Sequence, residues 1–258
     1  MAAGLYGLAA VALWGTNPPP LAESALLQAG TSLVAFGLAT WVFGFRVARL
    51  SWEQLRWTPG GRRGFFLGLP LGMAPAALAM AAALPLAGAG WAPDGGAAAD
   101  WAITVAATTA LLLPAAFAEE LIFRGVPQVV LGQAFGRGTA IVILAGVFAL
   151  AHGLNPGITP LAAGNIALAG VFLGVCFYLP GGLWAATGAH LGWNLTLAAL
   201  AAPVSGLPFA MPWLDYRAGA PEWLSGGDFG PEGGLLATAA LALAAVLALR
   251  LIRRSGQG

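Results

Sequence analysis

An apolar run that begins near Trp101 ends in two adjacent carboxylates and a guanidinium, in the stretch Ala118-Glu119-Glu120-Leu121-Ile122-Phe123-Arg124-Gly125. Only 8% of the residues in this chain are charged. An ionisable group at the centre of a membrane helix costs roughly 2.5–3.5 kcal/mol, so its presence there indicates a functional site. The stretch therefore marks both a membrane-embedded segment and the place where chemistry is expected.

Helical spacing divides the three charged residues of this stretch. Glu120 and Arg124 are four residues apart, share one face of a helix and can neutralise each other. Glu119 lies about 100° around the helix from that pair. A carboxylate in dry surroundings outside such a pair keeps the basicity that a general base needs near neutral pH. Glu119 is therefore the candidate base; the alternative is a buried ion-pair cluster that only fixes helix packing.

Composition places the chain among membrane proteins. Of its 258 residues, 59% are hydrophobic, the mean hydropathy is +0.82, and several apolar runs exceed eighteen residues. We expect an all-α, polytopic membrane protein of about eight transmembrane helices with an intramembrane polar cavity. The single cysteine, Cys176, excludes a disulfide framework and is expected to fill the core. All eleven basic residues are arginines and the net charge is +1, so no nucleic-acid partner is expected.

Apolar runs between polar or Gly/Pro-rich stretches define the expected spans. They are about Ala2–Gly15, Ser24–Phe45, Gly64–Ala89, Trp101–Phe123, Thr139–Leu154, Leu161–Leu179, Gly182–Ala201 and Gly234–Ile252. We divide this single integral unit into N-terminal membrane helices (1–100), a catalytic helical core (101–201), and an external loop with the last helix (202–258). Four-residue spacing of glycines predicts close helix packing at Gly64, Gly68 and Gly72, and again at Gly170 and Gly174.

Arginines fix the expected orientation. With eight spans they gather on one side, which the positive-inside rule makes cytoplasmic: Arg46, Arg49, Arg56, Arg62, Arg63, Arg137, Arg250, Arg253 and Arg254. Both termini then face the cytoplasm. The stretch Pro203–Gly233 becomes one long external loop, which Trp213 and Trp223 could anchor in the membrane interface.

The two histidines of the chain both fall within predicted spans. Phe148 precedes His152 by one helical turn, and Asn194 follows His190 by one turn. Each pair taken alone is more often a packing feature, but together with Glu119 they point to one shared polar site. Glu119, helped by His152, could hold and deprotonate a water, while His190 and Asn194 could donate hydrogen bonds to the oxyanion formed on an amide carbonyl.

Two other chemistries receive less support from the residues. A covalent route lacks a Gly-x-Ser-x-Gly elbow, and Cys176 has no His or Asn within its own helical turns. A metal route stays open, because Glu119, His152 and His190 could ligate one zinc with a water in the fourth place. The His-Glu-x-x-His spacing of many zinc proteases is absent.

Three motifs in series also resemble a known family. Glu119-Glu120-x-x-x-Arg124, Phe148-x-x-x-His152 and His190-x-x-x-Asn194 are similar to the motifs of the CPBP family of intramembrane proteases. That family includes the type II CAAX prenyl endopeptidases, the lysostaphin resistance protein A-like proteins and the bacterial abortive-infection proteins. The resemblance covers roughly Trp101 to Ala201 and implies an active site in a cavity within the bilayer.

The resemblance assigns roles to individual residues. It implies that Glu119 is the water-activating base with His152 beside it, and that His190 and Asn194 form the oxyanion hole. Glu120, Arg124 and Phe148 would be supporting residues. The implied partners are the lipid bilayer and a peptide or prenylated protein substrate, and the implied location is the bacterial cytoplasmic membrane. Whether the chemistry is glutamic or metal-dependent stays open at this point.

Two non-peptidase functions are compatible with the same sequence. Bacterial members of the family include bacteriocin-immunity proteins and scaffolds, so a non-catalytic membrane scaffold of the same fold is the main alternative. A transporter receives less support, because the polar segments show no inverted repeat and gather in one half of the chain.

The expected topology contains one conflict. Glu119 lies about eighteen residues into an inward-running span and His152 about thirteen residues into an outward-running one, so a rise of 1.5 Å per residue places them at different depths. A broken or tilted helix, or a later start of the fifth span, would bring them together. The stretch Val126–Gly136, which contains Pro127 and Gly132, is where we expect such a break.

Overall fold

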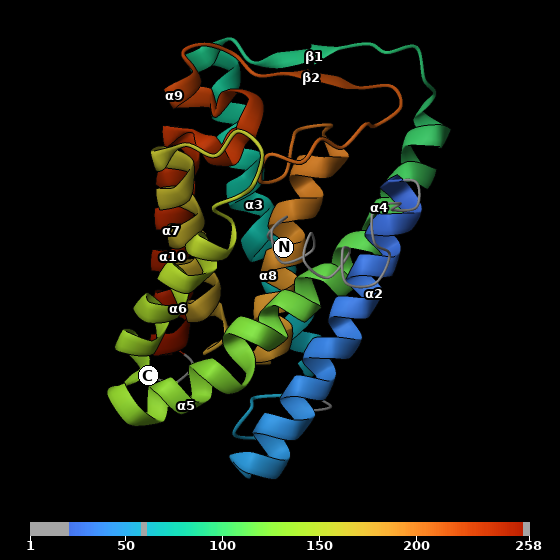
Figure 1. Cartoon of the computed structure of the whole chain (residues 1–258). Coiled ribbons are helices and arrows are strands. Elements are labelled where there is room, and N and C mark those ends of the chain that lie inside the picture. The colour runs from blue at the N-terminus through green and yellow to red at the C-terminus, as the bar shows by residue number, and fades with distance from the viewer. Residues whose placement is uncertain (1–20, 58–60, 255–258) are drawn as a thin grey trace.

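The computed structural model of the chain describes residues 21–57 and 61–254 and is built almost entirely of helices (Figure 1). The helices are α2 (Leu21–Ala39), η1 (Thr40–Val47), α3 (Arg62–Ala87), α4 (Ala98–Glu120), η3 (Leu121–Gly125), α5 (Val126–Phe135), α6 (Arg137–Ala151), α7 (Pro160–Cys176), α8 (Leu183–Ala199), α9 (Glu222–Ser225), η4 (Gly227–Phe229), η5 (Pro231–Gly233) and α10 (Leu235–Arg254). Two short strands, β1 (Gly90–Ala92) and β2 (Asp215–Arg217), pair antiparallel. The all-α expectation is confirmed.

Four helical segments are long and apolar enough to cross a membrane. They are Leu27–Val47, Arg62–Ala87, Ala98–Phe135 and Leu235–Arg254. The apolar helices α6 and α7 are shorter, with 15 and 17 residues, and the largely buried α8 has 17 residues. The protein is therefore a polytopic helical membrane protein. The first expected span, Ala2–Gly15, lies outside the described residues.

Helices α3 and α8 pack so closely that their backbones nearly touch. A Cβ atom added at Gly68 would meet the carbonyl oxygen of Ala185, and one added at Gly188 would meet the carbonyl oxygen of Phe65. The glycine series predicted for the first of these helices is thus a packing face, as expected. The second series is confirmed as well, because a Cβ atom at Gly170 would lie 2.8 Å from Cα of Ala145 on α6.

The charged motif lies where α4 changes its helical winding. The α-helix ends at Glu120 and a π-helical turn, Leu121–Gly125, carries the chain into α5. We expected a break within Val126–Gly136. The change of winding lies just before that stretch, because Pro127 occupies the first turn of α5, where its missing N–H costs no hydrogen bond. The helical run then ends inside the expected stretch, at Gly136, which has a φ of +86°. π-helical turns of this kind occur frequently at functional sites.

The same region resolves the conflict in depth between the two predicted catalytic residues. Helix α4 crosses the bundle obliquely relative to α7, α8 and α10 (Figure 1). Helix α6 begins at Arg137, earlier than the expected Thr139. Tilt of α4, rather than a later fifth span, therefore brings Glu119 and His152 to one cavity.

The long loop after α8 is folded and anchored. Strand β2 within it pairs with β1, and Tyr216 faces Trp91 in the register of that pair. The indole of Trp91 donates to the carbonyl of Leu200 at 2.7 Å, and the indole of Trp101 donates to that of Ala199 at 2.8 Å. These bonds occupy carbonyl groups at the C-terminal end of α8 that have no partner within the helix. The loop is thereby held over one end of the helices that carry the site.

Candidate active site

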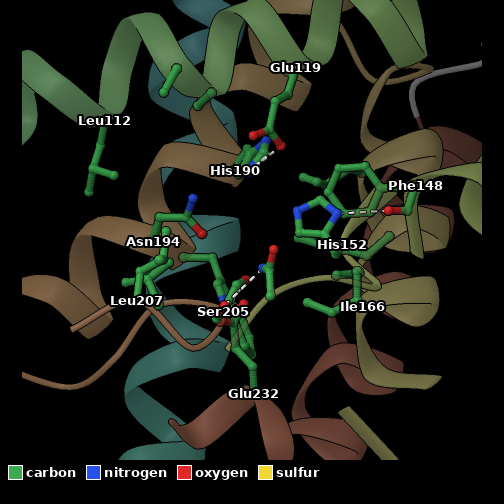
Figure 2. A pocket seen from close by; sticks show the side chains of 18 of the residues that line it. Leu112, Glu119, Phe148, His152, Ile166, His190, Asn194, Ser205, Leu207 and Glu232 are labelled. Atoms are coloured by element: carbon green, nitrogen blue, oxygen red, sulfur yellow. Dashed lines mark hydrogen bonds and ion pairs between the residues drawn. The ribbon is translucent and has the colours of Figure 1, made fainter. Parts of the chain in front are cut away.

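All the residues predicted to act directly on a substrate line one buried cavity of about 80 Å³ (Figure 2). Glu119 comes from the last turn of α4, His152 from the end of α6, and His190 and Asn194 from α8. Glu119 is 2% exposed, His152 4% and His190 7%. Polar groups at this burial require specific partners, and the contacts of each one show which atoms face the cavity.

Behind the cavity, Glu120 and Arg124 form the predicted ion pair. Nη1 of Arg124 lies 2.9 Å from Oε1 of Glu120, and both side chains are fully buried. Nη2 of Arg124 also donates to the carbonyl of Gly170 at 3.2 Å, and the guanidinium lies 4.6 Å from the ring centroid of Phe148. The pair thus joins α4 and the π-helical turn to α6 and α7, and it supports the site from behind.

The imidazole of His190 lies between the two carboxylates of the motif. Its Nδ1 lies 2.8 Å from Oε1 of Glu120, and its Nε2 lies 3.8 Å from Oε2 of Glu119. Because the Glu120 carboxylate can only accept, the proton of this bond belongs to Nδ1 of His190. Nε2 is therefore the atom directed toward Glu119 and the cavity, and it donates a hydrogen bond only when the ring is protonated.

His152 is oriented by its own helix. Its Nδ1 lies 2.7 Å from the carbonyl oxygen of Phe148, one turn earlier, so Nδ1 donates and Nε2 of the neutral ring is an acceptor. Figure 2 shows that second nitrogen pointing into the cavity, below Glu119. The ring of Phe148 packs against His152 at 4.4 Å and against Phe123 at 5.1 Å between centroids, which fixes the imidazole plane.

Sequence reasoning missed one buried carboxylate of the cavity. Glu232, which we placed only in the external loop, lines the cavity opposite Glu119 and is 4% exposed (Figure 2). Its Oε1 accepts from the indole of Trp193 at 3.0 Å, and its Oε2 accepts from the backbone N–H of Ser205 and from the Ser205 hydroxyl. No local spacing in the sequence distinguishes Glu232 from the exposed acids of the same loop.

The surroundings of Glu232 act on its protonation in opposite directions. Burial raises the pKa of the Glu232 carboxyl, while the hydrogen bonds from Ser205 and Trp193 and the nearby His190 oppose that rise; the net effect is upward. Asn165 on α7 also donates to the carbonyl of Glu232 at 2.8 Å. Glu232 therefore fixes the loop to α7 and α8 and forms the floor of the cavity.

The two histidines of the cavity resemble metal ligands in one respect, but they do not form a ligand group together with Glu119. Nδ1 of each histidine donates to a fixed acceptor, as in many metal-binding histidines. Within residues 21–57 and 61–254, however, no three His, Cys, Asp or Glu side chains form a group able to hold a metal ion. Glu119, His152 and His190 as arranged here do not make a three-ligand zinc site.

Comparison with known proteins supports the resemblance carried by the three motifs. Residues 101–196 match the family model described as type II CAAX prenyl endopeptidase Rce1-like. The matched segment includes the charged motif, both histidines and Asn194. The match confirms the resemblance to the CPBP family of intramembrane proteases over this segment, which at the family level indicates a peptidase of the CAAX-protease type. No curated protein and no solved structure matches the chain.

Proposed function

We propose that this protein is an intramembrane endopeptidase that hydrolyses a peptide bond close to the membrane, using a water activated by Glu119 and His152. The observation that carries the proposal is the convergence of a buried carboxylate and an imidazole acceptor in one cavity. Two such groups can hold a water between them and withdraw its proton.

The reaction assigns one role to each of these groups. A water held by Glu119 and by Nε2 of His152 loses a proton to this pair as its oxygen bonds to the carbonyl carbon of the substrate. The same pair then returns that proton to the amide nitrogen as the carbon–nitrogen bond breaks. The products are a carboxylic acid and an amine, so atoms and charge balance without another reactant.

His190 and Asn194 stabilise the negative charge that develops on the carbonyl oxygen. The carboxamide of Asn194 can donate in any protonation state of the site, whereas Nε2 of His190 donates when the ring is an imidazolium. The Glu120 carboxylate accepts from Nδ1 of His190 at 2.8 Å, which directs Nε2 of the ring toward the cavity. One such donor is typically worth 10²–10³ in rate, about 2.7–4 kcal/mol.

The substrate class follows from the surroundings of the cavity. Apolar side chains, among them Leu112, Ile166, Leu207 and Phe209, form much of its lining. A space of about 80 Å³ accommodates the scissile bond and a water but not a lipid chain. We therefore propose that a peptide or prenylated protein presents its cleavage site here while any attached lipid lies outside the cavity, in the membrane.

The decisive experiment compares cleavage by the purified, reconstituted protein with that by its Glu119→Gln variant. Peptides with and without a prenylated cysteine serve as substrates, and mass spectrometry of the products locates the cleaved bond. Loss of the base should reduce turnover by roughly 10²–10⁴-fold. Glu222→Gln, at an exposed acid of the loop after α8, is the matched control and should cleave normally.

Normal turnover by Glu119→Gln would contradict the proposed mechanism. The same variants test the scaffold alternative in cells. If Glu119→Gln, His152→Ala and His190→Ala proteins fold and keep the cellular phenotype, the protein acts as a scaffold rather than as a peptidase.

A further inference from the structure

A second cavity, of about 280 Å³, lies away from the catalytic residues. It is formed by the segment before α3, by α5 and the first residue of α6, and by the two residues that follow α7. Its polar lining residues are Glu53, Gln54, Arg56, Gln133, Arg137 and Tyr178. The positive-inside rule makes this arginine-bearing end of the helices the cytoplasmic one.

Arg56 is held rigidly at one side of this cavity. Its Nε donates to the carbonyl of Phe177 at 2.9 Å, and its Nη2 donates to those of Tyr178 and Leu179, each at 3.2 Å. These acceptors are uncharged main-chain groups just after the last turn of α7. These three bonds fix the position of the guanidinium at the edge of the cavity.

Arg137 brings a second positive charge to the same place. Its guanidinium lies 5.1 Å from the ring centroid of Tyr178, and that of Arg56 lies 5.8 Å from the same ring. Burial lowers the pKa of Arg56, and the charge of Arg137 lowers it further. Two cations thus face one cavity and repel each other, which favours an anion between them.

The remaining lining groups suit an anion with several acceptor oxygens. Two arginines against the single acid Glu53 give the lining a net charge of 2 − 1 = +1. Gln54 uses its amide oxygen to accept from the backbone N–H of Ser51 at 2.8 Å, so its NH₂ group is the end that can donate to a ligand. Arg137 is also the first residue of α6, where helix N–H groups lack partners within the helix.

We propose that this cavity binds the phosphate of an anionic phospholipid headgroup. Planar guanidinium groups match phosphate geometry, and basic pockets between membrane helices on the cytoplasmic side bind such headgroups. The membrane position of the cavity favours a lipid over a free ion. The preceding spanning segment ends at Val47 and the following one begins at Arg62, so Arg56 lies between two points where the chain meets the membrane boundary.

The test uses the delipidated, full-length protein and native mass spectrometry during titration with phosphatidylglycerol. Arg137→Gln should weaken lipid retention by at least tenfold, because it removes one of the two charges without touching the carbonyl contacts of Arg56. The matched control is Arg46→Gln. Arg46 also lies over an aromatic ring, 5.2 Å from that of Trp41, but it does not line the cavity.

Gln133→Glu gives an independent variant, since it places a negative charge in the lining and should also weaken retention by at least tenfold. Unchanged retention in both cavity variants, or an equal loss in Arg46→Gln, would overturn the proposal. Phosphatidylcholine, which has no net charge, should show no dependence on Arg137. Titration with inorganic phosphate separates the two sources of the anion: binding as tight as that of phosphatidylglycerol would overturn the assignment to a lipid.

Discussion

Oε1 of Glu120 lies 2.8 Å from Nδ1 of His190 and 2.9 Å from Nη1 of Arg124. One carboxylate oxygen therefore accepts from a guanidinium of its own segment and from an imidazole seventy residues later in the chain. Glu120 belongs to the support of the site, because it fixes the tautomer and the orientation of a ring whose other nitrogen faces the cavity.

This arrangement predicts that Glu120→Gln acts mainly on stability. Removing one partner of a buried ion pair leaves the other charge uncompensated, which typically costs about 3–5 kcal/mol. Unfolding of the purified protein in detergent measures the loss. The double variant Glu120→Gln with Arg124→Met should recover part of it, because no uncompensated charge remains. A Glu120→Gln protein as stable as the wild type would contradict this reading of the pair.

Whether cleavage depends on a metal ion can be tested directly in solution. Because Glu119, His152 and His190 do not form a three-ligand group here, we expect cleavage to survive exhaustive chelation. Metal analysis of the purified protein provides the independent check. One zinc per chain, lost in both His152→Ala and His190→Ala, together with chelation-sensitive activity that zinc restores, would show that a metal generates the nucleophile.

Glu232 predicts a particular dependence of stability on pH. The pKa of Glu232 is raised in the folded protein above the usual 4.5. Between the pKa of the unfolded state and that of the folded state, the folded protein therefore binds more protons than the unfolded protein. The free energy of unfolding contributed by Glu232 should therefore be largest at acid pH and fall as the pH rises through this window. Glu232→Gln should lack this slope.

The measurement is the unfolding midpoint in detergent of the wild type and of Glu232→Gln across the acid range. The control is Glu222→Gln, because Glu222 lies in the same loop but is exposed. Parallel stability profiles for the wild type and Glu232→Gln would show that Glu232 does not titrate differently on folding.

The contact between α3 and α8 predicts a large effect from one methyl group. Gly68→Ala places a Cβ atom against the carbonyl of Ala185, and overpacking of this kind typically costs 1–3 kcal/mol. Gly146→Ala on α6 is the matched control, because nothing lies within 4 Å of its added Cβ atom. Unfolding measurements should show a loss for Gly68→Ala only; equal stability of the two variants would mean that the helices separate easily.

The sequence alone determined the class of the protein and singled out four polar residues that line the candidate site: Glu119, His152, His190 and Asn194. The cost of burying charge in a membrane and the four-residue spacing of a helix are local properties, so Glu120–Arg124, Phe148–His152 and His190–Asn194 could each be paired from the sequence. The close-packing glycines could be found in the same way, because small residues at that spacing form one face of a helix.

Tertiary structure decided what each of these groups faces. The bond of His190 to Glu120, the tilt of α4, and the entry of Glu232 into the cavity depend on segments far apart in the chain. The π-helical turn at Leu121–Gly125 also lies outside what residue spacing predicts, since the i to i+4 spacing of Glu120 and Arg124 is that of a regular α-helix. A buried polar atom takes its role from the partner it reaches, and across helices that partner is fixed by packing rather than by sequence position.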